Sequence, residues 1–526
     1  MFSQLKSKIN LDTAKNRQRR KLFVADLYIV FKNKLFFLLA LIVAVSGSVF
    51  FFNTQAVSAD LYTKLLIHSD GDASSSQHNI TSYNNPVFDA ATKKFGGSSI
   101  KFNGSGSYLN SSDSDDWSFD SGDFTIDMWV RFDSVDNTWS ALAGQSGLAP
   151  TRGWALAYNN TNGLAFQHST NGTDWITDYF AWTPSVSTWY HIALVRTGDN
   201  LKAFVDGSQI GSDASMTGVI YNNTSSLGIG TYGDYLGDYL NGRIDEFRIS
   251  KGVARWTSGF TPSTSSYATD ANTKLLLHFD GDSSGQNHDM TFNGDMDSNA
   301  ANSKFDGSYY FDGNGDYLSL PDSDDWNFGG GDFTIDLWTK FNSLTDQGIL
   351  GQQNLSDSAN NRFILSFNNL QKRLYFNISS GGPLMTMYTS WNPSANTWYH
   401  LAVSKNNGEW HMFINGAAQY IEGNTNIQMP DLNGILTVGH HITGSGADLY
   451  YNGYIDELRV SKGVARWIDN FAVPTVPYEN DSVYLPAVTT VSIANLNSIT
   501  ATGNANLTAT GGENPERFIQ YSIVSN

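Results

Sequence analysis

The segment GDFTIDMWVRF at residues 122–132 decides the fold, because it recurs at residues 331–341 as GDFTIDLWTKF. Between Phe124 and Val130, apolar residues occupy every second position. Successive side chains of a β-strand point to opposite faces of the sheet, so this period of two predicts a strand with one face in a core.

Four further motifs repeat in the same order around this strand. They are TKLLIHSDGD (63–72) with TKLLLHFDGD (273–282), SDDW (114–117 and 323–326), TWYHIALV (188–195) with TWYHLAVS (397–404), and SKGVARW (250–256 and 461–467). A period near 210 residues is far too long for a solenoid, so each copy is a whole domain. We expect one module at residues 60–268 and a second at 270–478, joined by a Ser/Thr-rich linker at 261–272.

Short apolar runs between turns predict an all-β chain. Asp206-Gly207 and Asn415-Gly416 each follow such a run and are strong hairpin signals. No long stretch with the helical period of 3.6 occurs after residue 60, so a β-sandwich or barrel is expected. Residues 479–526 also alternate like strands, but are too short to form a stable domain alone.

The N-terminus predicts export. Residues 35–52 (LFFLLALIVAVSGSVFFF) carry no charge, and their length is at the short end of what spans a bilayer. Residues 1–34 hold nine Lys/Arg and two Asp/Glu, which predicts a basic cytoplasmic leader. Two interpretations fit: an uncleaved transmembrane helix that anchors the chain in the membrane, or a signal peptide cleaved after residues 57–59 (VSA). Both place the modules outside the cytoplasm, at the cell surface or secreted.

Charge and cysteine content exclude several functions. Residues 60–526 carry 23 basic and 48 acidic side chains, which disfavours binding to nucleic acid or anionic lipid. Such a surface suits neutral glycans and divalent cations. The absence of cysteine excludes thiol catalysis and cysteine-ligated zinc.

The five repeated motifs resemble the laminin G-like modules of the concanavalin A-like lectin/glucanase superfamily, and most closely the bacterial and phage form that ends in SKGVARW. The resemblance implies two tandem jelly-roll sandwiches after the N-terminal helix. It also implies binding of carbohydrate or protein in many relatives and catalysis in some. The segment 479–526 resembles the first strands of a fibronectin type III domain. Fold does not fix function, so the site must be argued separately.

The resemblance further implies a structural Ca²⁺ ion where the first and last strands of a sandwich meet. The expected ligands are Asp70 with Asp245 in the first module and Asp280 with Asp456 in the second. Calcium takes six to eight oxygen ligands, which carboxylates and carbonyls supply. The alternative is that these aspartates only shape turns, which Asp-Gly pairs do well.

The motifs do not predict an enzyme. Glucanases of this superfamily carry Glu-x-Asp-x-x-Glu or Glu-x-Asp-x-Glu along one strand, and neither module contains these patterns. Asp245 and Glu246 are adjacent, so in a regular strand they point to opposite faces. His191 and His400 repeat within TWYH and are interpreted as partly buried structural residues.

Aromatic residues that differ between the copies are the expected ligand contacts, because sugar rings stack on Trp and Tyr. The predicted ligand-binding residues are Trp154, Trp175, Tyr232, Tyr235, Trp410 and Tyr450, and Trp139 belongs to the same non-repeated group. The sequence thus predicts an extracytoplasmic binding or adhesion protein for a glycan or a protein partner. The alternatives are a structural spacer that displays another domain and, less favoured, a glycoside hydrolase.

Overall fold

The computed structural model describes residues 62–67, 71–278, 280–284, 286, 288–299, 302–305, 307–353, 361–380, 385–423, 428–443 and 446–478, and four strands outside these ranges. The four strands form two antiparallel pairs, β1 (Ala44–Val45) with β2 (Ser48–Val49) and β36 (Val488–Ala494) with β37 (Thr502–Leu507). The rest of the predicted leader, spanning segment and C-terminal segment lies outside the described residues. Among the residues that are described, no helix is long and apolar enough to cross a membrane.

The first repeat consists of strands and one 3₁₀ turn. They are β3 (Thr63–Ile67), β4 (Ile80–Tyr83), β5 (Val87–Asp89), β6 (Ser99–Asn103), β7 (Tyr108–Ser111), η1 (Asp115–Trp117), β8 (Phe124–Phe132), β9 (Trp139–Gln145), β10 (Trp154–Asn159), β11 (Gly163–His168), β12 (Ile176–Phe180), β13 (Trp189–Thr197), β14 (Asn200–Val205), β15 (Ser208–Ser215), β16 (Leu227–Ile229) and β17 (Asn241–Lys251).

The second repeat follows the same order with small differences. Its elements are β18 (Thr273–Leu277), β19 (Met290–Asn293), β20 (Asp297–Ser298), β21 (Tyr309–Asp312), β22 (Tyr317–Leu320), η2 (Asp324–Trp326), β23 (Phe333–Phe341), β24 (Gln347–Gln353), β25 (Asn361–Asn368), β26 (Arg373–Ser380), β27 (Met385–Ser390), β28 (Trp398–Asn406), β29 (Glu409–Ile414), β30 (Ala417–Ala418), β31 (Glu422–Gly423), β32 (Ile435–Val438), β33 (His440–Ile442), β34 (Asp448–Tyr450) and β35 (Asn452–Lys462).

Two sheets enclose the core of each sandwich. In the first sandwich, strands in the order β12-β11-β10-β9-β16-β7-β4 face strands in the order β15-β14-β13-β8-β17-β6-β5. On β8, every second residue from Phe124 to Phe132 is buried in the core, which confirms the predicted alternation. The all-β sandwich predicted from the repeated motifs is therefore confirmed.

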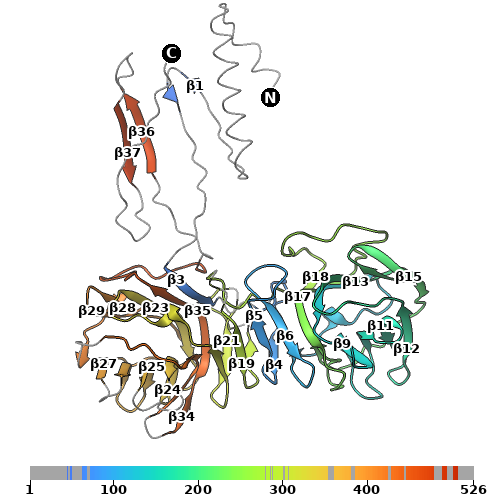
Figure 1. Cartoon of the computed structure of the whole chain (residues 1–526), viewed down its shortest axis with the longest axis horizontal. Coiled ribbons are helices and arrows are strands. Elements are labelled where there is room, and N and C mark those ends of the chain that lie inside the picture. Colours follow the sequence, from blue (N-terminus) through green and yellow to red (C-terminus); the bar gives the residue numbers. More distant parts are fainter. Residues whose placement is uncertain are drawn as a thin grey trace, which may run out of the picture. The chain divides into compact units, whose positions relative to one another are not determined.

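The first strand of each repeat belongs to the sandwich of the other repeat. β18 pairs antiparallel with β17, with Phe247 opposite Leu277 and Ser250 opposite Thr273. β3 pairs with β35, with Thr63 opposite Ser461, as Figure 1 shows. The predicted boundaries at 60–268 and 270–478 thus separate the repeats, whereas each sandwich takes one strand from across that boundary.

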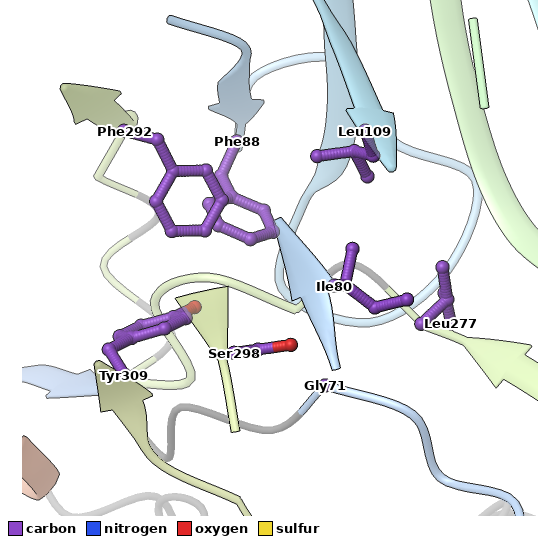
Figure 2. A pocket seen from close by; sticks show the side chains of 8 residues that line it. All are labelled: Gly71, Ile80, Phe88, Leu109, Leu277, Phe292, Ser298 and Tyr309. Carbon is purple, nitrogen blue, oxygen red and sulfur yellow. The ribbon is translucent and has the colours of Figure 1, made fainter. Parts of the chain in front are cut away.

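Both sheets also continue from one sandwich into the other. β4 pairs with β20 and β5 pairs with β19, so the seam between the sandwiches is hydrogen-bonded in both layers. A single core cluster contains residues of both repeats, and the rings of Phe88 and Phe292 meet at the seam with centroids 4.9 Å apart. The same rings line a small, mainly apolar cavity of about 30 Å³. Figure 2 shows the side chains around it. The two sandwiches therefore share one hydrophobic core.

A buried ion pair explains why FTID, TWYH and the Arg of the last strand repeat together. Asp127 is fully buried, and Arg248 Nε and Nη2 donate to its carboxylate at 3.0 and 2.8 Å. His191 Nε2 lies 3.6 Å from the same carboxylate. Burial opposes ionisation of Asp127, but the Arg248 cation and the His191 hydrogen bond outweigh it and lower its pKa. The second sandwich repeats the pair with Arg459 and Asp336.

The segment expected to be a linker covers the outer face of the sheet that contains β8 and β17, where the Asp127–Arg248 pair lies. Tyr267 is buried, its N–H donates to Glu246 Oε2 at 2.7 Å, and its ring lies 4.2 Å from the Arg248 guanidinium. Trp256 and Phe260 stack with centroids 4.0 Å apart over the same sheet. Residues 254–267 are thus part of the sandwich.

The exchange of strands can be tested with two matched proline substitutions, Leu65→Pro in β3 and Leu275→Pro in β18. The backbone of Leu276 faces Asp72 and Ala73, so the N–H of its neighbour Leu275 faces β17, and Leu65 holds the equivalent position opposite β35. Proline lacks this N–H, and an orphaned buried partner costs about 1–3 kcal/mol. We expect Leu65→Pro to increase amide hydrogen exchange in β35, and Leu275→Pro to increase it in β17. The reverse assignment, with Leu65→Pro exposing β17, would show that each repeat closes its own sandwich.

Candidate functional site

An aromatic cavity of about 250 Å³ lies on the first sandwich, on the outer side of the sheet that contains β9 and β11. Its lining residues come from these strands and the loops around them: Trp139, Gly147, Leu148, Arg152, Gln167, Trp175, Tyr232, Tyr235 and Asp238. A site of this size accommodates a small ring or two.

Small side chains lie beneath the aromatic rings of this cavity. Ala141, Ala155 and Ala157 are fully buried beneath Tyr232 and the partly buried rings of Trp139 and Trp175. Side chains of β9 and β10 that point inward fill the hydrophobic core. Side chains that point outward have no core to fill, so small residues are tolerated there. Large residues at the three alanines would fill the space between the rings.

Polar groups border the aromatic rings. The Tyr232 hydroxyl is hydrogen-bonded to the Asp238 carboxylate, and burial raises the pKa of both groups. Arg152 Nη1 donates to the carbonyl of Thr173 at 2.8 Å, and its guanidinium lies 5.6 Å from the Trp175 ring. Gln167 projects from β11 into the cavity. Apolar ring faces with a few fixed donors and acceptors suit a ligand that has both apolar faces and hydroxyl groups.

Three of the six predicted ligand residues meet at this cavity. Trp175, Tyr232 and Tyr235 all line it. Their common signal in the sequence is an aromatic residue that the other copy lacks. Arg152, Gln167 and Asp238 escaped prediction, because polar residues are common in such loops; Gln167 could have been inferred from the alternation of β11.

The other three predicted ligand residues lie elsewhere. Trp154 is fully buried in the core and donates Nε1–H to the carbonyl of Trp117 at 2.9 Å, so the prediction that it contacts a ligand is wrong. Trp410 is also buried in the core, 5.5 Å from the Phe333 ring. Tyr450 lies on the second sandwich, stacked on His440. A residue can differ between copies because their cores are packed differently, and this accounts for the two tryptophans.

The corresponding face of the second sandwich has different chemistry. β16 and β32 hold equivalent places in the two sandwiches, with Gly228 corresponding to Thr437. Tyr232 lies four residues after Gly228, and His441 lies four residues after Thr437, so these two residues are equivalent. His441 is buried, and burial together with the Arg362 cation lowers its pKa to about 3. An uncharged imidazole thus stands where the first sandwich has a tyrosine. The two sandwiches share a fold but present different surfaces.

Two of the aspartates predicted to bind calcium, Asp245 of the first repeat and Asp280 of the second, lie near each other. Asp245 is buried, and its Oδ2 accepts the N–H groups of Lys94 and Phe95 at 2.6 and 3.1 Å, while its Oδ1 has no hydrogen-bond partner. Asp280 accepts the N–H of Gly97, and its charge, with that of Glu246, adds to burial in raising the pKa of Asp245 to about 8.

The expected partners of Asp245 and Asp280 were wrong, because the first strands are exchanged. Asp245 lies beside Asp280 of the other repeat, and Asp456 holds the equivalent position in the second sandwich, accepting from the N–H of Lys304 at 2.9 Å. Asp70 lies outside the described residues. A buried carboxylate oxygen without a donor, next to a second carboxylate, fits a hard divalent cation.

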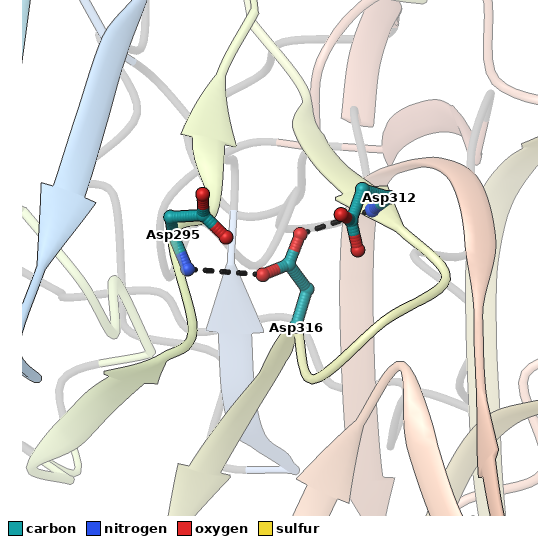
Figure 3. A group of neighbouring side chains, drawn as sticks. All are labelled: Asp295, Asp312 and Asp316. Carbon is teal, nitrogen blue, oxygen red and sulfur yellow. Dashed lines mark hydrogen bonds between the residues drawn. The ribbon is translucent and has the colours of Figure 1, made fainter.

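A third group of acidic residues lies at the seam, and backbone hydrogen bonds within the turns that carry it account for its arrangement. Asp295, Asp312 and Asp316 hold carboxylate oxygens within 4.8 Å of one another. Both oxygens of Asp316 accept backbone N–H groups, from Asp295 and Asp312, each at 3.0 Å. Figure 3 marks these two bonds with dashed lines. Burial raises the pKa of Asp316 to about 7, while these two bonds oppose the rise.

Comparison with protein families gives a match in each repeat. Residues 103–257 and 312–466 match the laminin G model of the concanavalin A-like lectin/glucanases superfamily. The chain belongs to this family. Its description includes lectins and glucanases, and membership supports a binding role in general.

Several solved structures show a low similarity to this chain. Domains LG4-5 of the mouse laminin alpha1 chain are 12% identical, with 78% of this chain and 94% of that chain covered and a TM-score of 0.25. Domain 4 of AbnA, a GH43 extracellular arabinanase from Geobacillus stearothermophilus solved with arabinotriose, is 22% identical, covering 32% and 75%, with a TM-score of 0.26. A protein from Bacteroides ovatus, titled a putative carbohydrate binding protein, is 16% identical, covering 39% and 52%, with a TM-score of 0.26. We draw nothing about function from similarities this low. A comparison with curated proteins gives no match.

The turn at Asp316 in this laminin G-like chain predicts a pH dependence. Its folded-state pKa of about 7 lies above the ordinary aspartate value, so the folded state holds a proton that the unfolded state has lost. The resulting stabilisation is complete at about pH 4 and is lost as the pH rises to about 7. We expect Asp316→Ser to reduce the fall in Tm over this range, measured with EDTA present. Serine occupies the equivalent position, Ser107, and accepts the N–H of Asn103 there. Asp431→Ser, at an exposed position, is the control, and an unchanged slope in Asp316→Ser would contradict the prediction.

Proposed function

We propose that this chain binds carbohydrate outside the cytoplasm, through the aromatic cavity of the first sandwich. The observation that carries the proposal is the grouping of Trp139, Trp175 and Tyr232 around the cavity, over a layer of three buried alanines. Pyranose and furanose rings have apolar faces that stack on such rings, and their hydroxyls bond to groups such as Gln167 and Asp238.

The charge of the chain supports a neutral glycan over other ligands. The 48 acidic side chains after residue 59 outnumber the 23 basic ones, so polyanions are repelled. A protein partner would need a broad surface of about 800 Å² on each side, whereas the cavity is small and concave. The basic leader and apolar segment before residue 53 support an extracytoplasmic location.

The cavity supports binding without hydrolysis. Glycoside hydrolases use two carboxyl groups, about 5–5.5 Å apart in retaining enzymes and about 6.5–9.5 Å apart in inverting ones. Among the residues described as lining the cavity, Asp238 is the sole carboxylate. We therefore propose a lectin-like role.

The carbohydrate proposal is tested by titrating the purified full chain against a glycan array and measuring the affinity of each hit by calorimetry. We expect Trp139→Ala and Trp175→Ala each to weaken binding about tenfold, because a lost aromatic stacking contact costs about 0.5–1.5 kcal/mol beyond the area it buries. Tyr420→Ala, which changes a tyrosine that is 83% exposed and lies outside the cavity lining, should have no effect. If no glycan binds with either calcium or EDTA present, the proposal fails and the spacer alternative is left.

We also propose that calcium binds at Asp245 and Asp280 in the first sandwich, and at the equivalent site around Asp456 in the second. The orphaned Oδ1 of Asp245 supports the first of these sites. The ion would neutralise carboxylates that are costly to bury and would join the last strand of one repeat to the loop after the first strand of the other.

Calcium titration of the chelated full chain tests this second proposal. We expect two ions per chain, each stabilising the folded state by about 2.7 kcal/mol when free calcium is about 100 times its Kd. Asp245→Asn should reduce the number of bound ions to one, and Asp456→Asn should do the same at the other sandwich. A Tm that calcium leaves unchanged would contradict a structural role for the ion.

A further inference from the structure

The sheet that carries the cavity does not end at the first sandwich. Its strands continue in the order β9-β16-β7-β4-β20-β21-β35-β23-β28, and the step from β4 to β20 crosses the seam, with Thr81 opposite Asp297. The outer face of this sheet therefore extends from the cavity into the second sandwich.

The pairing register places one row of side chains along this face. Directly opposed residues on adjacent strands point to the same side of a sheet. Starting inside the cavity, the row runs through Gln167, Ala155, Gly144, Gly228, Asn110, Thr81, Asp297, Tyr310, Tyr454, Lys340 and Trp398. From β7 to β28 the row crosses six strand spacings, or roughly 29 Å at about 4.8 Å each.

Tyrosine rings lie in this row or directly beside it on both sides of the seam. Tyr310 and Tyr454 belong to the row, whereas Tyr108 and Tyr83 are two residues along β7 and β4 from its members there, and so lie one side-chain position to its side. In the first sandwich Tyr239 stacks on Tyr108, which stacks on Tyr83, with centroids 6.0 and 4.8 Å apart. In the second, the rings of Tyr310 and Tyr454 are 5.0 Å apart. We call these five residues the tyrosine row. Tyr108 is buried between its neighbours, and the other four are partly exposed.

Hydrogen-bonding groups separate the two sets of rings. Asp297 lies in the row at the seam and accepts the hydroxyl hydrogen of Thr81. Asn110 is half-buried beside Thr81, and Asp295 is exposed next to the seam. Tyr239 directly follows Asp238, which lines the cavity, so the tyrosine row and the cavity adjoin.

The fold does not require tyrosine at these positions. The other sheet has an equivalent seam, where β5 pairs with β19, and there Lys101 and Arg243 occupy the positions of Tyr310 and Tyr454. Arg243 forms ion pairs with Asp89 and Asp133, each at 2.5 Å. The same strand positions are thus satisfied by salt bridges on one face and by aromatic rings on the other.

We propose that the tyrosine row binds the continuation of a neutral, linear glycan chain whose end occupies the cavity. The proposal rests on the proposed function and deepens it, since it assigns a polysaccharide in place of a short sugar. The alternation of ring faces with carboxylate, amide and hydroxyl groups along a line matches a polymer of sugar rings, each with an apolar face and hydroxyl edges. The second sandwich then contributes to the same binding surface as the first.

The test compares oligosaccharides of increasing length, built from the sugar found on the array, by calorimetry on the purified full chain. We expect affinity to rise at least tenfold with length once the chain outgrows the cavity. The double variant Tyr310→Lys and Tyr454→Arg, which introduces the residues of the equivalent face, should remove this gain. Tyr310→Phe with Tyr454→Phe keeps the rings and should retain it, which separates loss of stacking from misfolding. Tyr375→Ala, on the other sheet, is the control.

The outcomes separate this proposal from the cavity itself. Short and long oligosaccharides that bind equally well would overturn the tyrosine row and keep the cavity. Long chains that Trp139→Ala leaves bound, but that Tyr310→Lys with Tyr454→Arg releases, would support the row and contradict the cavity. A length gain that survives in the Lys/Arg variant would also overturn the row.

Discussion

Each sandwich is completed by a strand that belongs, along the chain, to the other repeat, and the rest of the structure depends on this exchange. Because β18 lies on β17 and β3 on β35, residues 71–72 and 280–282 follow strands at the edge of the foreign sandwich and lead back across the seam. Asp72 illustrates this, since its Oδ1 accepts the N–H of Leu276 at 3.0 Å. Together with the pairing of β4 with β20 and of β5 with β19, the exchange joins two sandwiches that share one core.

Comparison of the two copies separates what the fold needs from what it allows. The Asp127–Arg248 pair recurs as Asp336–Arg459, and in both copies a histidine and a tyrosine complete the surroundings of the buried carboxylate. Breaking one partner of such a pair leaves an uncompensated buried charge, which costs about 3–5 kcal/mol. Positions on the open faces are under no such constraint, and there the copies differ most.

The sequence predicts the fold well because its signals are local and doubled. Alternation from Phe124 to Phe132 and the repeated motifs are enough for an all-β sandwich, and the absence of a counterpart in the other copy points to Trp175 and Tyr232. The same criterion fails for Trp154, because the core of the second sandwich fills that space differently. The exchange could not be predicted, since TKLLI and TKLLL are nearly identical strands that can pair with either partner. The choice of partner strand depends on how the two repeats meet at the seam, and contacts between residues so far apart in the chain leave no local signal in the sequence.

The exchange also fixes how the molecule responds to tension. The carbonyl of Tyr62 accepts the N–H of Lys462 at 2.8 Å, and residues 463–478 then stay on the same sandwich, where Tyr478 is buried and hydrogen-bonded to His400. The described chain thus enters and leaves at the second sandwich. A pull on its two ends is borne there, by β3 and by the segment 463–478. The first sandwich, with its cavity, lies outside the path of the force. A ligand held there would stay bound while the chain is stretched, until β3 peels away.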